Sequence, residues 1–377
     1  MKNNSALYIH IPFCDHKCIY CDFYSIITSD NITNYLSALK REIDFYSGKY
    51  SASHSFNTIY FGGGTPSLMQ PEYISEIVSH IKTKFIVSDD AEVTLETNPG
   101  TVDYKKLTDF LSSGINRISI GIQSFNEDEL KFLTRIHSGQ TAIDTVIAAK
   151  HAGFENISID LIFNLPNQTK EKWIENLKTA FTLPINHIST YSLILERGTI
   201  LNKMVLDGKV ILQDDDYDAD LYESTINYIL DKGMIQYEVS NFCYPGFESI
   251  HNNAYWHYND YLSFGTSAHS FMNGKRWHNC SSLKMYIDLI DEKNNALISK
   301  EILTKIEMEE EYWFLAFRSR GLIAEEYISK FGNSRLNQNS DLISNLIDEG
   351  FMLNQNGVIR LTPKGFAVCD EILSRFK

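Results

Sequence analysis

Three cysteines near the N-terminus form the pattern with the clearest chemistry. Cys14, Cys18 and Cys21 are spaced as CxxxCxxC. Three thiolates on one short loop can hold three corners of a [4Fe–4S] cluster. The fourth iron then has no protein ligand and is open to the amino and carboxylate groups of S-adenosylmethionine. Reduction of such a pair cleaves the sulfonium and releases a 5′-deoxyadenosyl radical, with the cofactors carrying that chemistry.

Two other interpretations of the cysteine run are a zinc site and a group of buried thiols. A zinc ion would take His10 or His16 as its fourth ligand, but zinc sites usually combine two separated ligand pairs, and no second pair is present. The remaining cysteines, at 243, 280 and 369, are scattered. This spacing is not a disulfide framework, and buried thiols are expected there.

The overall composition excludes some classes of protein. The 377 residues are 43% hydrophobic, and 34 basic residues against 48 acidic ones give a net charge of -14. A nucleic-acid-binding protein would show net positive charge or a basic stripe, so no nucleic-acid partner is expected. The sequence contains no signal peptide and no stretch of roughly 20 apolar residues, which favours a cytoplasmic protein.

The cysteines and the other reactive residues must be positioned by the elements of the first half. Strand patterns alternate with helical ones, and the strands are expected at 6–11, 58–61, 92–96, 117–121, 156–161 and 187–193. Helices are expected between them, at 31–45, 71–85, 103–113, 141–152 and 170–182. This alternation predicts an α/β fold with a parallel sheet. Six units without a GxGxxG after the first strand favour a partial (β/α)6 TIM-like barrel, and a doubly wound open sheet is the alternative.

In such a barrel the carboxyl ends of the strands share one face. The residues with chemical potential follow these ends: the cysteines after the first strand, the GGGTP run at 62–66 after the second, then Glu96, Gln123 and Asp160. Glycines let a ligand approach the backbone closely. The two carboxylates suit ribose hydroxyls, Arg135 can pair with a carboxylate, and Gln123 offers both donors and an acceptor.

The second half has a different pattern. Residues 196–300 contain a helix expected at 214–232, a strand at 236–239 and a loop-like stretch at 241–280. Residues 301–377 have the order of a winged-helix-like α+β domain, with an Asn356-Gly357 hairpin turn. We therefore predict three domains, at 1–195, 196–300 and 301–377. Residues 300–377 hold 10 Lys and Arg against 12 Asp and Glu, which favours a packing or regulatory module over DNA binding.

Several collinear motifs resemble those of one family. They are YIHIPFC at 8–14, CIYC at 18–21, FGGGTP at 61–66, ETNP at 96–99, GIQSF at 121–125, RIH at 135–137 and DLIFNLP at 160–166. The chain resembles radical SAM proteins of the oxygen-independent coproporphyrinogen III oxidase (HemN-like) group. Two features distinguish a branch within it. Phe23 occupies the position of the oxidase's fourth cysteine, and HNNAYW at 251–256 looks like the HNxxYW signature of the heme-chaperone branch.

The resemblance implies roles for individual residues. Cys14, Cys18 and Cys21 would ligate the cluster. The first S-adenosylmethionine would be lined by Tyr8, Tyr20, Gly63, Gly64, Thr65 and Glu96. Gln123, Arg135 and Asp160 would lie near it or near a second molecule. No catalytic residue is assigned.

The resemblance also implies heme as cargo and an apo-heme protein as its recipient. His251 offers an imidazole for iron, and Tyr255 and Trp256 could stack on a macrocycle, although the same residues suit a structural loop. His257, His269, His278 and Cys243 are competing ligands. A transient membrane-protein contact and a homodimer are compatible with this role.

Two other functions stay open at this point. One is the oxidase reaction of porphyrin biosynthesis, in which coproporphyrinogen III gives protoporphyrinogen IX, and Phe23 disfavours it because an apolar ring cannot replace a thiol. The other is radical chemistry on a different substrate.

Overall fold

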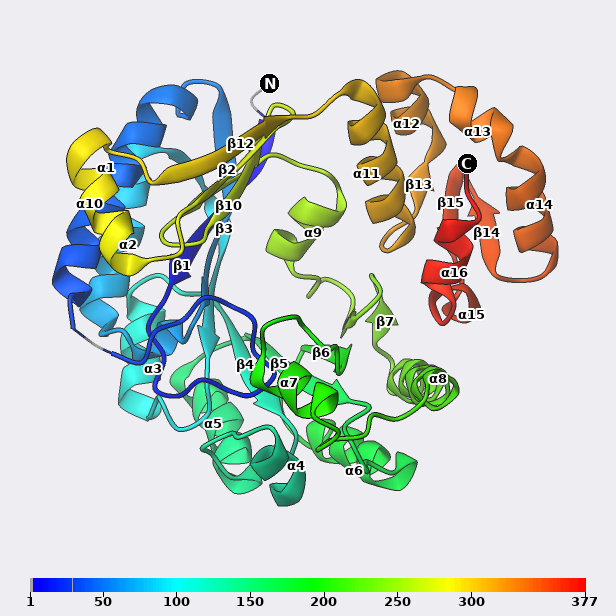
Figure 1. The fold of residues 1–377 in the computed structure, drawn as a ribbon, viewed down its shortest axis with the longest axis horizontal. Coiled ribbons are helices and arrows are strands. Elements are labelled where there is room, and N and C mark those ends of the chain that lie inside the picture. Colours follow the sequence, from blue (N-terminus) through cyan, green and yellow to red (C-terminus); the bar gives the residue numbers. More distant parts are fainter. Residues whose placement is uncertain (1–2, 29) are drawn as a thin grey trace.

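The fold is built around one curved sheet. In the computed structural model, which describes residues 3–28 and 30–377, this sheet has twelve strands (Figure 1). Its centre is a run of six parallel neighbours in chain order: β1 (Asn3–Ile11), β2 (His54–Gly63), β3 (Ile86–Thr97), β4 (Arg117–Gln123), β5 (Asn156–Phe163) and β6 (His187–Ser192). The partial barrel and each of its six expected strands are confirmed.

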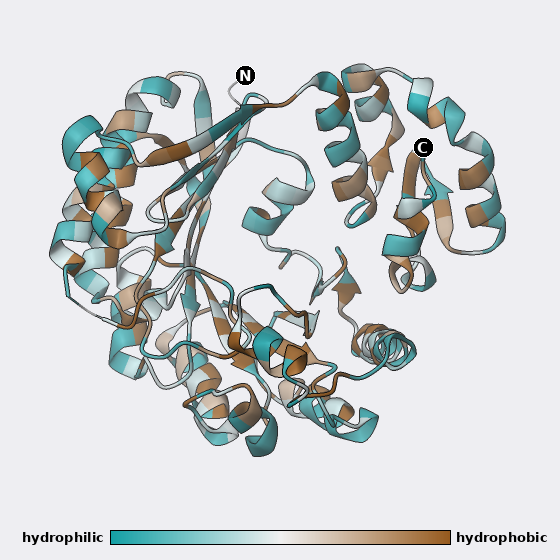
Figure 2. Cartoon of the chain, in the orientation of Figure 1, coloured by the Kyte–Doolittle hydropathy of each residue, from teal (hydrophilic) through white to brown (hydrophobic). Residues whose placement is uncertain are grey.

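Helices cover the outer face of this sheet. They are α1 (Ile32–Tyr50), α2 (Pro71–Lys84), α3 (Tyr104–Ser112), α4 (Glu127–Phe132), α5 (Gly139–Ala152) and α6 (Lys170–Ala180). Figure 2 shows hydrophobic residues along one side of many of them and hydrophilic residues along the other. Side chains of Asp103, Ser138 and Thr169 cap the N-termini of α3, α5 and α6, and Gly153 ends α5 with a φ of 108°.

Alternation along the strands separates the core from the barrel interior. Leu7 and Ile9 of β1 are fully buried in the hydrophobic core, whereas Tyr8 and His10 point to the opposite face. In β3 the same alternation places Glu92, Thr94 and Glu96 on one face. The interior of the barrel is therefore lined by polar and aromatic side chains.

The segment between 196 and 300 extends the same sheet. It contains α7 (Ile200–Leu206), α8 (Asp215–Asp231), β7 (Ile235–Gln236), β8 (Asn241–Cys243), α9 (Ile250–Trp256), β9 (Tyr261–Phe264), β10 (His269–Met272), β11 (Lys275–Asn279), α10 (Leu283–Lys293) and β12 (Leu297–Ile302). The expected helix at 214–232 is confirmed. The loop-like assignment of 241–280 is wrong, and the strand expected at 236–239 lies at Ile235–Gln236. Strands of two to five residues are too short for a hydrophobic period to show.

The strands of this segment close both edges of the central sheet. β9 pairs in parallel with β1, and β8 pairs antiparallel with β6. The helix α9 lies near the centre of the view in Figure 1 and contacts β1 and β2.

The C-terminal elements form a separate small sheet with its helices. They are α11 (Lys305–Phe317), β13 (Leu322–Ile323), α12 (Ala324–Phe331), α13 (Ser334–Gln338), α14 (Ser340–Asp348), β14 (Met352–Gln355), β15 (Val358–Leu361), α15 (Pro363–Phe366) and α16 (Cys369–Ser374). The hairpin turn has φ of 53° at Asn356 and 79° at Gly357, as a type I′ turn requires. Within residues 3–28 and 30–377, no helix has the length and apolar character needed to cross a membrane.

Candidate cofactor site and barrel interior

The loop between β1 and α1 carries the three clustered cysteines and is anchored at both ends and in its middle. The Cys14 N–H donates to the Ile26 carbonyl at 3.0 Å, and the Ile26 N–H to the Pro12 carbonyl at 2.8 Å. Farther along, the Ile19 carbonyl accepts a hydrogen bond from the Leu201 N–H at 2.9 Å, and the Ile19 N–H donates to the Thr134 hydroxyl at 3.2 Å. The loop is therefore tied to α7 and to the segment after α4.

The three thiols are free, half-buried and supplied with polar neighbours. Cys14 Sγ lies 3.2 Å from the Thr65 hydroxyl, and Arg135 Nη1 lies 3.7 Å from Cys18 Sγ. Burial raises the pKa of the Cys21 thiol, although nearby Lys17 opposes this. A cubane takes one thiolate at each of three separate irons, and donors near the sulfurs tune it. This donor set fits such a cluster. Among the described residues, no group of three or more His, Cys, Asp or Glu side chains is placed so that it could hold a single metal ion.

The glycine run after β2 has no room for side chains. Gly63 has a φ of +113°, and a Cβ there would lie 2.6 Å from the His10 ring. A Cβ on Gly64 would lie 2.6 Å from the Phe13 carbonyl oxygen. Only glycine fits positions this close to the cysteine loop. The Gly63 N–H donates to Glu96 Oε2 at 3.2 Å, so the run also contacts the end of β3.

Two buried carboxyl groups lie inside the barrel, that of Glu96 on β3 and that of Asp160 on β5. Glu96 accepts the Tyr60 hydroxyl at 2.8 Å, and burial raises its pKa to about 7, with Tyr60 opposing and Asp160 adding to the rise. Burial also raises the pKa of Asp160, which lies 3.4 Å from the Ser119 hydroxyl. Because its pKa lies near 7, the Glu96 carboxyl group can switch between accepting and donating hydrogen bonds.

Arg135 and Gln123 meet at the end of β4. Arg135 Nη2 donates to the Gly121 carbonyl at 2.6 Å and to Asn98 Oδ1 at 2.8 Å, while its Nε has no partner in the described structure. Gln123 lies at a β-bulge with a φ of 71°, which directs its amide back across Gly121. Tyr20 packs against a small hydrophobic cluster that includes Leu133. The predicted S-adenosylmethionine residues therefore converge around the cysteine loop.

Aromatic stacking joins this site to α9. The Tyr8 and Tyr60 rings stack at 6.1 Å, and Tyr60 stacks on His251 at 4.7 Å. His251 is buried, and both ring nitrogens are engaged: Nδ1 lies 2.5 Å from the Thr58 hydroxyl and Nε2 lies 2.8 Å from the Tyr255 hydroxyl. Burial lowers its pKa to about 3. In this conformation neither nitrogen is free for iron.

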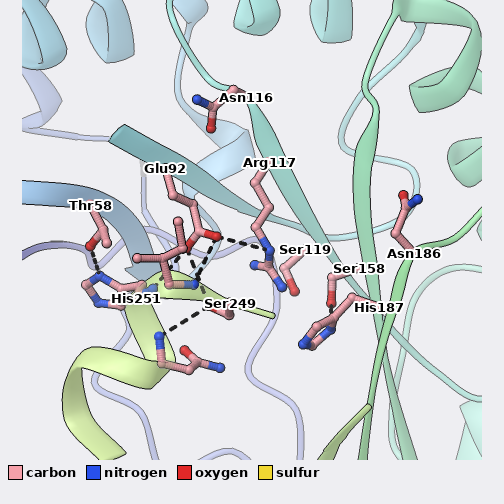
Figure 3. Close-up of polar contacts among 12 residues, drawn as sticks. Thr58, Glu92, Asn116, Arg117, Ser119, Ser158, Asn186, His187, Ser249 and His251 are labelled. Carbon is pink, nitrogen blue, oxygen red and sulfur yellow. Dashed lines mark hydrogen bonds and ion pairs between the residues drawn. The ribbon is translucent and has the colours of Figure 1, made fainter. Parts of the chain in front are cut away.

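A buried ion pair holds α9 in the barrel and was not predicted from the sequence. Figure 3 shows Glu92 between Arg117 and the first turn of α9. Glu92 accepts the backbone N–H groups of Ile250 and His251 at 3.1 and 3.0 Å, and Arg117 Nε lies 3.9 Å from its Oε2. The period-two polar pattern of β3 is the signal that could have revealed Glu92.

The other residues considered for heme are dispersed. Trp256 and His257 are half-buried, and Cys243 is buried in β8. The rings of His269 and His278 stack across neighbouring strands at 4.9 Å. Phe23 is 61% exposed on the cysteine loop.

Comparison with known proteins identifies the class of protein that has these features. The model of the radical SAM superfamily matches residues 8–180. The solved structure of coproporphyrinogen III oxidase (HemN) from Escherichia coli matches with a TM-score of 0.84 and 23% identity, covering 99% of this chain and 90% of that one. The parallel barrel with its three-cysteine loop is that of a radical SAM protein, and this membership implies a [4Fe–4S] cluster and S-adenosylmethionine.

The full-length relatives define the family more closely. The heme chaperone HemW of Bacillus subtilis is 34% identical, with 98% of each chain covered. HemW of Lactococcus lactis is 35% identical, with 100% of this chain and 97% of the relative covered. This chain belongs to the HemW family, within the HemN-like radical SAM proteins.

Proposed function

We propose that this protein is a heme chaperone that binds heme and delivers it to apo-proteins. The observation that carries the proposal is similarity to proteins named as heme chaperones along nearly the entire chain. Phe23 adds independent support, because its exposed ring offers neither a metal ligand nor a proton or hydrogen donor where the oxidase pattern has a thiol.

In this proposal Cys14, Cys18 and Cys21 ligate the cluster. When bound, the cluster and S-adenosylmethionine supply reductive cleavage of the sulfonium to a 5′-deoxyadenosyl radical. Thr65 and Arg135 direct donors at the sulfurs of the loop. The residues proposed to line S-adenosylmethionine are Tyr8, Tyr20, Gly63, Gly64, Thr65 and Glu96, with Gln123, Arg135 and Asp160 beside them.

The recipient in this proposal is an apo-heme protein, and a transient contact with a membrane protein is part of the same proposal. A cytoplasmic location, a homodimer and the three-domain division at 195 and 300 belong to the same proposal.

The test begins with protein whose cluster has been reconstituted anaerobically. Hemin is titrated in and followed by its absorbance, and the loaded protein is then mixed with an apo-heme protein on a separable tag. We expect saturable binding and transfer of heme to the tagged acceptor. In parallel, the protein receives dithionite, S-adenosylmethionine and coproporphyrinogen III. Stoichiometric or greater formation of protoporphyrinogen IX would overturn the proposal as the main function.

A further inference from the structure

A chain of hydrogen bonds joins two of the clustered cysteines through the turn after β3, with Asn98 in the middle. Asn98 Oδ1 accepts from Arg135 Nη2 at 2.8 Å, and Asn98 Nδ2 donates to the Thr65 hydroxyl at 2.9 Å. At one end of this hydrogen-bond chain, Arg135 Nη1 lies 3.7 Å from Cys18 Sγ. At the other end, the Thr65 hydroxyl lies 3.2 Å from Cys14 Sγ. Asn98 therefore connects the two sulfurs through the side chains on either side of it.

The donor and acceptor roles in this hydrogen-bond chain are fixed from the Arg135 end. A guanidinium has only donors, so the Asn98 oxygen faces Arg135 and the Asn98 NH2 group faces Thr65. Because the Thr65 oxygen accepts that N–H, the hydroxyl proton is left for its other neighbour, Cys14 Sγ. The sulfur can accept it, since the Cys14 thiol donates its own proton to the His16 carbonyl at 2.9 Å. The orientation of the Asn98 amide thus makes Thr65 a donor to a cysteine sulfur.

The turn that carries Asn98 is held by further hydrogen bonds. The Asn98 N–H donates to the Ser67 hydroxyl at 3.3 Å, and the Thr101 hydroxyl donates to the Asn98 carbonyl at 2.7 Å. Lys106 Nζ donates to the carbonyls of Ser67 and Thr101 at 2.6 and 3.2 Å. Gly121 leaves room for the amide, since a Cβ there would lie 3.3 Å from Asn98 Oδ1. The backbone around Asn98 is therefore fixed, and its side chain is directed between Arg135 and Thr65.

We propose that Asn98 is a positioning residue for the cluster: it holds the Thr65 hydroxyl as a donor to Cys14 Sγ and so raises the reduction potential of the bound cluster. This inference rests on the cluster assignment within the proposed function. Reduction adds negative charge to a cluster, and a hydrogen-bond donor at a ligating sulfur stabilises that charge. Thr65 is only 2% exposed, so its bond to the sulfur is formed away from bulk water, where such bonds are stronger.

The test uses the full-length protein with a reconstituted cluster and without S-adenosylmethionine, so that contacts of Thr65 with that ligand do not enter the measurement. The protein is poised at a series of potentials, and the reduced cluster is quantified by electron paramagnetic resonance. At the wild-type midpoint potential, Asn98→Ala and Thr65→Val should each show an about tenfold lower ratio of reduced to oxidised cluster. For a one-electron couple this is a shift of about 59 mV to lower potential. Thr65→Ser retains the hydroxyl and should match wild type.

A double variant tests whether Asn98 acts through Thr65. Asn98→Ala combined with Thr65→Val should shift the midpoint no farther than Thr65→Val alone, because the donor to the sulfur is already gone. Thr101→Val is the matched control: it removes a hydrogen bond from the same turn but leaves the hydrogen-bond chain intact, and its midpoint should match wild type. If Asn98→Ala takes up no iron, Asn98→Asp replaces it. Its carboxylate accepts from Arg135 but has no N–H for Thr65, so its midpoint should also be lower.

The outcomes separate this inference from the proposed function. A wild-type midpoint in the Asn98 variants would overturn the inference, and so would strictly additive shifts in the double variant or an equal shift in Thr101→Val. Each of these results leaves the cluster and the chaperone function in place, since both are measured on wild type. Wild-type protein that takes up no iron and sulfide would overturn the cluster assignment and this inference together.

Discussion

At the scale of single residues, the glycine run makes the sharpest structural demand. Both Gly63 and Gly246 have a positive φ, but only Gly63 faces a close neighbour, since nothing lies within 4 Å of a Cβ on Gly246. We expect Gly63→Ala to lower the free energy of unfolding by about 3 kcal/mol or more, because strain in φ adds to a clash with His10. Urea denaturation measures this.

Gly246→Ala is the matched control for that substitution. It retains the cost of the positive φ, about 1 kcal/mol, without the clash. Equal losses in the two variants would show that the approach to His10 does not matter.

The cysteines lead to a prediction about the cluster. Cys18→Ala should bring the iron and sulfide content of anaerobically reconstituted protein near background, since a cubane on two thiolates is poorly held. Cys369→Ala, at a buried thiol of α16, should retain full iron content. Iron analysis together with visible absorbance provides the measurement. Full iron content in Cys18→Ala would contradict the ligand assignment.

Much of the candidate cofactor site could be proposed from these residue types alone. The cysteines, the glycines and the strand-end carboxylates can be recognised by their spacing and by their position after predicted strands. Tyr60 and Arg117 could not be recognised in this way, because the importance of a single polar or aromatic residue in a strand depends on which face of the barrel it takes. Glu92 lies in the alternating polar pattern of β3, but its partners in α9 are distant in the sequence. His251 had a conspicuous motif, but its two hydrogen-bonded nitrogens depend on Thr58 and Tyr255, which only folding brings together.

At the scale of elements, the position of α9 depends on Glu92. Glu92→Ala should lower the free energy of unfolding by about 3–5 kcal/mol, because it leaves Arg117 buried without its partner and frees two N–H groups of the helix. Chemical denaturation measures the loss.

A double-mutant cycle tests whether the ion pair is the cause. Arg117→Met in the Glu92→Ala background should recover part of the stability, since the uncompensated charge is gone. Strict additivity of the two substitutions would show that Glu92 acts only as a helix cap.

The element order of the first half was predictable because its strands and helices are long enough to show periodicity. The strands β9–β11 were not, since each spans four or five residues among scattered aromatics. Their place in the sheet comes from pairing with β1 and with one another, which is information distant in the sequence.

At the scale of the whole molecule, a buried carboxylate fastens the first helix to the extension. Glu42 of α1 accepts the Gly265 N–H at 2.9 Å, the Tyr286 hydroxyl at 2.7 Å and the Asn279 amide at 2.6 Å. Burial raises its pKa from 4.5 to about 7, against the effect of these hydrogen bonds. The folded protein therefore binds this proton more tightly than the unfolded chain does.

This shift predicts how stability depends on pH. The Glu42 contribution is fully present below pH 4.5 and is lost as the pH rises to about 7, a change of about 3 kcal/mol. In Glu42→Gln the free energy of unfolding should fall less over this window, as measured by urea denaturation at several pH values. Glu223→Gln, at an exposed position, should follow wild type. Parallel curves for all three proteins would contradict the prediction.

The pairing of β1 with β9 limits the order in which the sheet can form during translation. Ala6 to Ile9 receive their partners on this edge only when Tyr261 to Phe264 have been synthesised. At the usual speed of translation, roughly 5–20 residues per second, that interval is on the order of 10–50 s. Throughout this interval β1 lacks its neighbour on the β9 side. The β1 edge of the sheet therefore stays unpaired until about two thirds of the chain has been synthesised.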